Sequence, residues 1–122
     1  MNRSAIQVFV KDSGSALEFY KKAFDAKVLG VYPNEDGTLM HSEIDVYGQI
    51  MMISELTEEN AVTGNTMMFC LDFGEGKESV VQKIYDVLKD GAKIIYPLSK
   101  CEYSPLMTDL IDKFGVRWCI FV

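Results

Sequence analysis

The sequence predicts an α+β fold built from two copies of a β-α-β-β-β unit. Strand-like and helix-like segments follow the same order in both halves, and a polar stretch at residues 55–64 separates the halves. Short residue matches also recur in the same order. The 122 residues fit one domain, 1–122, with a first module at about 1–57 and a second at about 64–122.

The first module begins with a strand rich in β-branched and aromatic residues at 5–11, and a helix follows it. Asp12 or Ser13 is the expected N-cap of this helix, and Ser15 with Glu18 matches a capping box. The apolar stripe of the helix consists of Ala16, Leu17, Tyr20, Ala23 and Phe24. Three more strands are expected at 26–32, 38–46 and 49–54, with turns at 33–37 and 47–48.

The second module repeats this order. A strand is expected at 66–73, and a helical stripe runs from Val81 to Leu88 and stops at Gly91. Three further strands are expected at 92–98 and on either side of 112–115. The matches between modules join 9–12 to 69–72 at an offset of 60, 26–29 to 92–95 at 66, and Gly48 to Gly115 at 67. Because the offset jumps by six inside the helical segment, we expect the second helix to be longer.

Charge and composition narrow the classes of partner. With a net charge of −6 and a pI of about 4.7, the protein is negatively charged at neutral pH and repels phosphate groups. No run of Lys or Arg forms a local basic patch. We therefore expect neither a nucleic acid nor a membrane as a partner. A membrane-spanning segment is also not expected, because no apolar stretch reaches the roughly 18 residues that a span needs. Three cysteines without CxxC spacing favour reduced thiols in the cytoplasm. Cys70 and Cys119 are expected in the core, and Cys101, in a polar segment, is the candidate reactive thiol.

Three segments resemble the vicinal-oxygen-chelate superfamily, which includes glyoxalases, bleomycin-resistance proteins and dioxygenases. Residues 15–26 resemble its "AxxFYxxxFGA" helix. Residues 112–118 resemble the "DxFGxxW" hairpin of the PhnB-like subgroup, and 40–43 resemble its "mHaE" strand. The resemblance implies an open, curved eight-stranded mixed sheet with the helices outside, in a homodimer. A methyltransferase label carried by some PhnB-like proteins does not fit, since the sequence has no Gly-rich nucleotide loop.

The resemblance also implies where a metal ion would bind. Metal-dependent relatives place one His or Glu on each of four strands, pointing into the cavity. The motif match puts these positions at Ala5, Met52, Thr66 and Cys119, none of which is a histidine or a carboxylate. We therefore expect no metal ion and no other cofactor.

One polar cluster is expected in the cavity. A turn at 47–48 pairs Glu43 with Met52 and His41 with Ser54, so His41, Glu43 and Asp45 share a strand face. A histidine beside a carboxylate can act as a general base or hold a polar ligand, and any solvated sheet face shows the same alternation. The candidate ligand-binding residues are Phe9, His41, Glu43, Met52, Met68, Arg117 and Phe121, with His41 as the one catalytic candidate.

Three functions fit these features. The first is a metal-free, glyoxalase- or bleomycin-resistance-like protein that binds a small, partly apolar ligand in a dimeric cavity. In this function Arg117 holds an anionic group, although it could instead pair with Glu43 or Asp45. The second is a metal-independent isomerase, lyase or hydrolase that uses His41 as base. The third is an accessory or structural dimer without a ligand.

Overall fold

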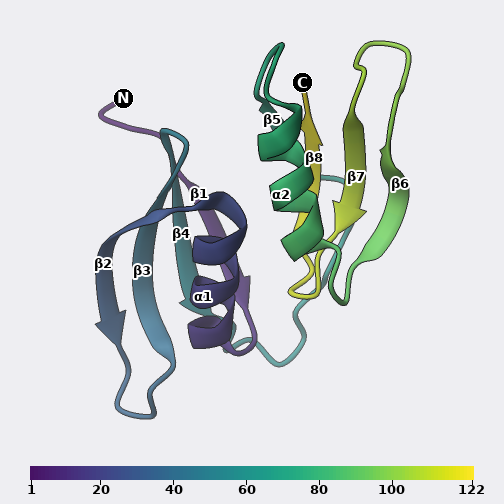
Figure 1. Cartoon of the computed structure of the whole chain (residues 1–122). Coiled ribbons are helices and arrows are strands. Elements are labelled where there is room, and N and C mark those ends of the chain that lie inside the picture. The colour runs from purple at the N-terminus through teal and green to yellow at the C-terminus, as the bar shows by residue number, and fades with distance from the viewer. The chain divides into compact units, whose positions relative to one another are not determined.

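The computed structural model describes all 122 residues, which form two compact units, Met1–Ala61 and Val62–Val122. Each unit contains four strands and one helix in the order β-α-β-β-β (Figure 1). The predicted α+β fold of two such modules is confirmed. The boundary between the units lies inside the predicted connector. Neither helix has the length and apolar character that crossing a membrane would require.

The first unit forms a mixed sheet with the strand order β1-β4-β3-β2. Its elements are β1 (Ile6–Val10), α1 (Ser13–Phe24), β2 (Lys27–Pro33), β3 (Leu39–Val46) and β4 (Gln49–Glu55). β1 runs parallel to β4, and the other two pairs are antiparallel. Tyr47 and Gly48 both have positive φ, 51° and 93°, as the expected two-residue hairpin turn requires.

The second unit has the same topology, β5-β8-β7-β6, with β5 parallel to β8. Its elements are β5 (Phe69–Asp72), α2 (Glu78–Leu88), β6 (Lys93–Ser99), β7 (Met107–Ile111) and β8 (Arg117–Phe121). β5 is shorter than the strand predicted at 66–73. Both edge strands carry an irregularity at the same place, between Val28 and Gly30 in β2 and between Ile94 and Tyr96 in β6, which supports the internal repeat.

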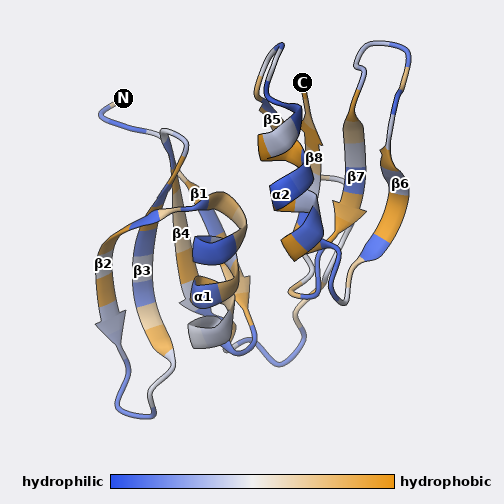
Figure 2. Cartoon of the chain, in the orientation of Figure 1, coloured by the Kyte–Doolittle hydropathy of each residue, from blue (hydrophilic) through white to orange (hydrophobic).

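In each unit the helix covers one face of the sheet, and alternate strand residues are buried beneath it. Figure 2 shows hydrophobic and hydrophilic residues alternating along β3, where Ser42, Ile44 and Val46 are buried. The largest fully buried side chains are Tyr20, Phe24, Ile44, Met51 and Ile53 in the first unit, and Ile84, Leu88, Leu110, Trp118 and Ile120 in the second. The opposite face of each sheet, which we call the open face, has no helix of its own unit over it.

The ladders correct the expected match between the first strands of the modules. Counted from the glycine of each final hairpin, Met51 and Trp118 are equivalent positions. Ile6 pairs with Met51 and Phe69 pairs with Trp118, so Phe69 corresponds to Ile6 and not to Phe9. The expected longer second helix is also wrong, because α2 has 11 residues and α1 has 12. The extra residues of the second unit lie in the loops before and after α2.

A carboxylate distant in sequence caps α1. Asp12 is the N-cap residue, as predicted, but its side chain makes no capping hydrogen bond. Instead Glu55, at the end of β4, accepts hydrogen bonds from the backbone N–H groups of Asp12 and Ser13, at 3.2 and 2.9 Å. It also accepts one from the Ser13 hydroxyl at 2.8 Å. The negative charge at the helix N-terminus ties the start of α1 to the last strand of its sheet.

A buried carboxylate, Asp112, organises the β7–β8 hairpin. Asp112 accepts hydrogen bonds from the N–H groups of Phe114 and Val116 and from the indole N–H of Trp118, at 2.9, 3.1 and 2.9 Å. Gly115 takes positive φ in the turn between them. The motif at 112–118 therefore has a structural role, because the Asp112 carboxylate holds the turn together and orients the buried ring of Trp118.

Replacing Glu55 should destabilise the first unit. Glu55→Ala removes the cap of α1 and leaves the buried Ser13 without its acceptor. We expect the free energy of unfolding to fall by about 1–2 kcal/mol in urea denaturation. Glu58→Ala, in the exposed connector, is the matched control and should change stability little. Equal stabilities of the two variants would show that Glu55 does not cap the helix.

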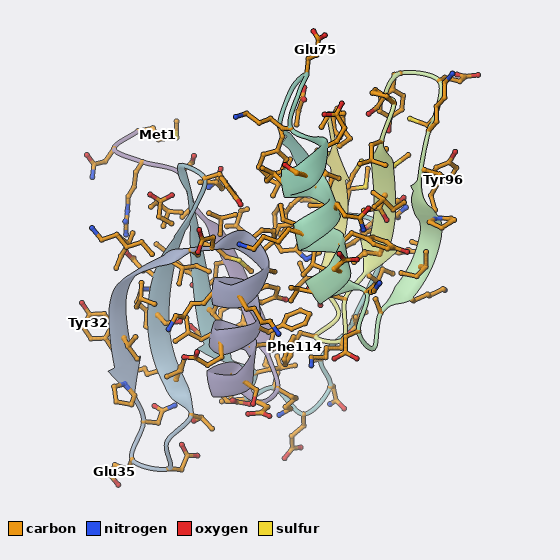
Figure 3. The ribbon with its side chains drawn as sticks, in the orientation of Figure 1. Met1, Tyr32, Glu35, Glu75, Tyr96 and Phe114 are labelled. Atoms are coloured by element: carbon orange, nitrogen blue, oxygen red, sulfur yellow. The ribbon has the colours of Figure 1, made fainter.

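Replacing Asp112 should destabilise the second unit more. Asp112→Ala leaves two backbone N–H groups and the Trp118 indole without their carboxylate acceptor, which should cost about 3 kcal/mol or more. Asp112→Asn keeps one acceptor oxygen and should recover part of this loss. Tryptophan fluorescence during denaturation follows the effect at Trp118 itself. The control is Glu75→Ala, at the tip of the loop between β5 and α2 (Figure 3).

Candidate functional site

The open face of the first sheet carries four of the predicted ligand-binding residues: Phe9, His41, Glu43 and Met52. Strand pairing brings three strands together here, because Glu43 pairs with Met52 on one side and Met52 pairs with Gln7 on the other. Partners in a ladder share a face, so these side chains point away from α1. The predicted pairing of Glu43 with Met52 is therefore confirmed.

His41 and Glu43 contact each other on this face, as their spacing on one strand suggested. His41 Nε2 lies 3.2 Å from Glu43 Oε1, and the two side chains are 32% and 18% exposed. An ionised carboxylate can only accept a hydrogen bond, so the contact places the imidazole proton on Nε2. The lone pair on Nδ1 of His41 is then available to accept a proton or a hydrogen bond.

Arg3 contacts Glu43 from the other side, a contact that was not predicted from the sequence. Its Nη2 lies 2.8 Å from Oε1 of Glu43, and Nη1 lies 3.3 Å from Oε2. The hydrogen bonds from Arg3, followed by the one from His41, lower the pKa of Glu43 and keep it ionised. Arg3 lies before β1, where strand alternation assigns no face, so no pattern in the sequence places it beside Glu43.

Tyr32 lies beside His41, on the side of β3 that faces the edge strand, and it was not among the residues predicted from the sequence. It pairs with His41 across β2 and β3, and the two rings lie 5.9 Å apart between centroids. Figure 3 shows Tyr32 on the edge strand β2. A Cβ atom at Gly30 would lie 3.2 Å from Cε2 of Tyr32, so the ring folds back over this glycine. Gly30 thus provides the space that keeps Tyr32 beside His41.

Apolar and neutral polar groups surround the charged cluster. Phe9 is 60% exposed, and Met52 is half-buried between β1 and β3. The amide nitrogen of Gln7 donates to the hydroxyl of Ser54 at 3.2 Å and to the carbonyl of Val8 at 3.0 Å. Gln7 is exposed, and its side-chain carbonyl oxygen remains an acceptor. The open face of the first unit therefore presents exposed aromatic rings beside an ordered set of hydrogen-bonding groups.

In the second unit, Arg117 pairs with Asp109, a carboxylate that was not among its predicted partners. Its Nε and Nη2 donate to the two oxygens of Asp109 at 3.0 and 2.8 Å, and its Nη1 donates to the carbonyl of Asn65 at 2.7 Å. Asp109 is thus the carboxylate partner of Arg117, in place of Glu43 or Asp45. The paired guanidinium has less charge to offer an anionic group than the sequence suggested.

Phe121, another predicted contact, is covered by Tyr103 from the loop between β6 and β7. The two rings meet edge to face with centroids 5.5 Å apart. The Tyr103 hydroxyl points inward to Cys119 Sγ at 4.0 Å, although the residue as a whole is 64% exposed. Desolvation of the hydroxyl, followed by the contact with Cys119, raises the pKa of Tyr103 to about 12. Tyr103 therefore remains a neutral cover over Phe121 and Cys119.

The positions that would hold the metal of related enzymes do not fit a divalent metal of that kind. Ala5 has no donor atom, Met52 offers a thioether, and Thr66 lies before β5 rather than on it. Burial raises the pKa of the Cys119 thiol, which opposes the thiolate that a metal needs. No group of three or more His, Cys, Asp or Glu side chains in the chain is placed to bind a metal ion.

The Glu43 contacts predict a pH-dependent contribution to stability. Because the folded state lowers the pKa of Glu43, its stabilising effect is complete above the ordinary value of 4.5 and disappears as the pH falls through the folded value. The difference in unfolding free energy between the wild type and Glu43→Gln should therefore be largest near neutral pH and shrink below pH 4.5. Denaturation curves from pH 7 to 3 measure it. A constant difference across this range would contradict the ion pair.

Comparison with known proteins identifies the family. The profile of the Glyoxalase/Bleomycin resistance protein/Dioxygenase superfamily matches residues 4–120. An uncharacterised protein of Mycobacterium bovis is 28% identical to this chain, and the alignment covers 91% of this chain and 76% of the length of that protein.

Two solved structures have the same fold. A putative 3-demethylubiquinone-9 3-methyltransferase of Bacillus cereus, described as a PhnB protein, has a TM-score of 0.85 at 20% identity, over 98% of both chains. The fosfomycin resistance protein FosX of Listeria monocytogenes, solved with Mn(II) and a dihydroxypropylphosphonic acid, has a TM-score of 0.72 at 13% identity. That alignment covers 98% of this chain and 90% of FosX. With its two β-α-β-β-β units and the match over nearly its whole length, the chain belongs to the glyoxalase/bleomycin resistance/dioxygenase superfamily.

Proposed function

We propose that this protein binds a small, partly apolar molecule on the open face of its first unit, without a metal ion. The observation that carries the proposal is the cluster of Arg3, Glu43 and His41, ordered by hydrogen bonds and flanked by the exposed rings of Phe9 and Tyr32. Ligand sites combine apolar walls with a few fixed polar groups in this way. In solution we expect the protein to act as a homodimer.

The electrostatics of the cluster favour a ligand without a full charge. Glu43 neutralises Arg3 through two hydrogen bonds, so neither group presents an unpaired charge to a ligand. His41 offers the lone pair of Nδ1, and Gln7 offers a carbonyl oxygen. Both are acceptors, so the best partner is a ligand with a hydroxyl or N–H donor attached to an apolar body. In the second unit, the two oxygens of Asp109 accept hydrogen bonds from Arg117, so this guanidinium also presents no unpaired charge.

Dimer formation is supported by the edge strand of the first sheet. β2 has a sheet neighbour on one side only, and its Leu29 and Val31 are 46% and 43% exposed. Apolar edge strands are normally protected from unspecific pairing, and pairing with a second copy of the chain is one way to protect them.

Catalysis by His41 is the second candidate function, and one observation favours it. Glu43 fixes the imidazole tautomer with Nδ1 as the base, and Arg3 keeps Glu43 ionised. This is how a carboxylate orients a histidine for proton transfer. A metal-independent isomerase, lyase or hydrolase would use Nδ1 to remove a proton from the bound molecule. An accessory dimer without a ligand is the third candidate, and it predicts no small-molecule binding at all.

Native mass spectrometry of the protein purified from its own cells should detect a dimer that retains a small organic molecule. Once that molecule is identified, His41→Ala should weaken its binding about tenfold, since one hydrogen bond is worth roughly 1–1.5 kcal/mol. Gly30→Ala should also weaken binding, because the new Cβ displaces Tyr32. The matched control is Glu18→Gln on the exposed side of α1, which should bind like the wild type.

The same variants separate the three candidates. Loss of affinity in His41→Ala with no chemical change of the molecule supports binding. Conversion of the molecule by the wild type and not by His41→Ala, at similar affinity, supports catalysis. A monomer or dimer that retains nothing, and whose melting temperature no metabolite raises, would refute both and leave the accessory function.

A further inference from the structure

Two cysteines lie side by side on the open face of the second unit. Cys70 in β5 pairs directly with Cys119 in β8 in the parallel ladder. Neighbouring strands are about 4.8 Å apart, which lies within the Cα separation of roughly 4.4–6.8 Å that a disulfide spans. Because ladder partners point to the same face, the two thiols face the same side of the sheet. Cys70 was expected in the core, and that expectation is wrong, since it is exposed.

The two thiols differ in accessibility. Cys70 is open to solvent, whereas Cys119 is only 4% exposed and lies beneath the Tyr103 hydroxyl. Burial raises the pKa of Cys119, the Tyr103 hydrogen bond opposes this, and the Cys70 thiol adds to the rise. The effect of the Cys70 thiol on the pKa of Cys119 agrees with the pairing of the two residues in the ladder. An oxidant in solution therefore meets Cys70 first.

Cys101 provides an internal comparison. It lies on the same loop as Tyr103, and its backbone N–H donates to the Ser104 carbonyl at 2.9 Å. It is half-buried and has no cysteine as a ladder partner. Like Cys119, it interacts with the Tyr103 hydroxyl, so Cys101 is the competing partner for Cys119 that the test has to separate from Cys70.

We propose that Cys70 and Cys119 are a reversible dithiol–disulfide pair, with Cys70 as the attacking thiol and Cys119 as the resolving thiol. The oxidant is a low-molecular-weight disulfide such as glutathione disulfide. The Cys70 thiolate attacks one of its sulfurs, the S–S bond breaks, and one glutathione leaves with the proton that Cys70 lost. Cys119, deprotonated in turn, attacks the Cys70 sulfur of the mixed disulfide and releases the second glutathione. Two protein thiols are oxidised, and one glutathione disulfide is reduced to two thiols.

Oxidation would change the cover over the open face of the second unit. Forming the S–S bond turns the Cys119 sulfur toward Cys70 and makes it a poorer hydrogen-bond acceptor, so the contact from the Tyr103 hydroxyl is weakened. Tyr103 then keeps its edge-to-face contact with Phe121 and its interaction with Cys101. The pair therefore links the redox state to the exposure of Phe121, one of the predicted ligand contacts.

The test uses the full-length reduced protein in mixtures of glutathione and glutathione disulfide. Intact mass, followed by alkylation and peptide mapping, should find loss of two hydrogens and a cross-link between Cys70 and Cys119. Cys101→Ser should form the same cross-link to the same extent. Cys70→Ser should form none, while its unchanged melting temperature shows that it is folded. Tyr103→Ala should form the cross-link several-fold faster, because it uncovers Cys119.

Three results would overturn the proposal. One is a glutathione adduct on Cys70 that never resolves to an internal disulfide. Another is a cross-link between Cys101 and Cys119 that Cys70→Ser leaves unchanged. The third is complete resistance of all three thiols at every ratio of glutathione disulfide to glutathione. The outcome does not depend on the proposed ligand site, since no residue of the first unit enters the measurement.

Discussion

Each four-stranded sheet has a single helix to cover it, and the other features of the molecule follow from this limit. The parallel pairing of the first strand with the last requires a crossover connection, and α1 and α2 lie in those crossovers. One helix can bury only one face. The second face of each sheet, the open face, therefore does not have to pack against a helix of its own unit. All the predicted ligand-binding residues that lie on strands are found on this face. The fold supplies the surface, and the side chains on it decide what it can bind.

The two units treat equivalent positions of this face in the same way. Glu43 in β3 and Asp109 in β7 follow the irregularity of the neighbouring edge strand, and each accepts two hydrogen bonds from an arginine. The arginines come from different places, Arg3 before β1 and Arg117 in β8. The surrounding groups then differ: the first carboxylate orients a histidine, and the second lies opposite Cys119. The scaffold thus holds an arginine–carboxylate pair at the same place in each unit, with different neighbours around it.

Features that depend on residue periodicity, such as strand faces and hairpin pairing, could be predicted from the sequence. Contacts between residues far apart in the sequence could not. Alternation along strands placed His41 and Glu43 on one face, and the two-residue turn gave the partner of Glu43 correctly. Short identities did not fix the register of β5, because β-branched and aromatic residues suit any strand position. Glu55 as a helix cap and Tyr103 as a cover could not be found by pattern. Each acts on residues that lie far from it in sequence or on another strand.

The parallel pairing also has a kinetic consequence. The β3–β4 and β7–β8 hairpins close over a few residues, whereas Ile6 must find Met51, 45 positions away, and Phe69 must find Trp118, 49 positions away. Closing the longer loops costs more chain entropy, so β1 and β5 should join sheets whose hairpins already exist. A nascent chain would then carry β1 for most of the synthesis of its unit without a partner. Once β4 has been made, and until β1 joins it, the exposed edge of β4 is the place where misassembly can begin.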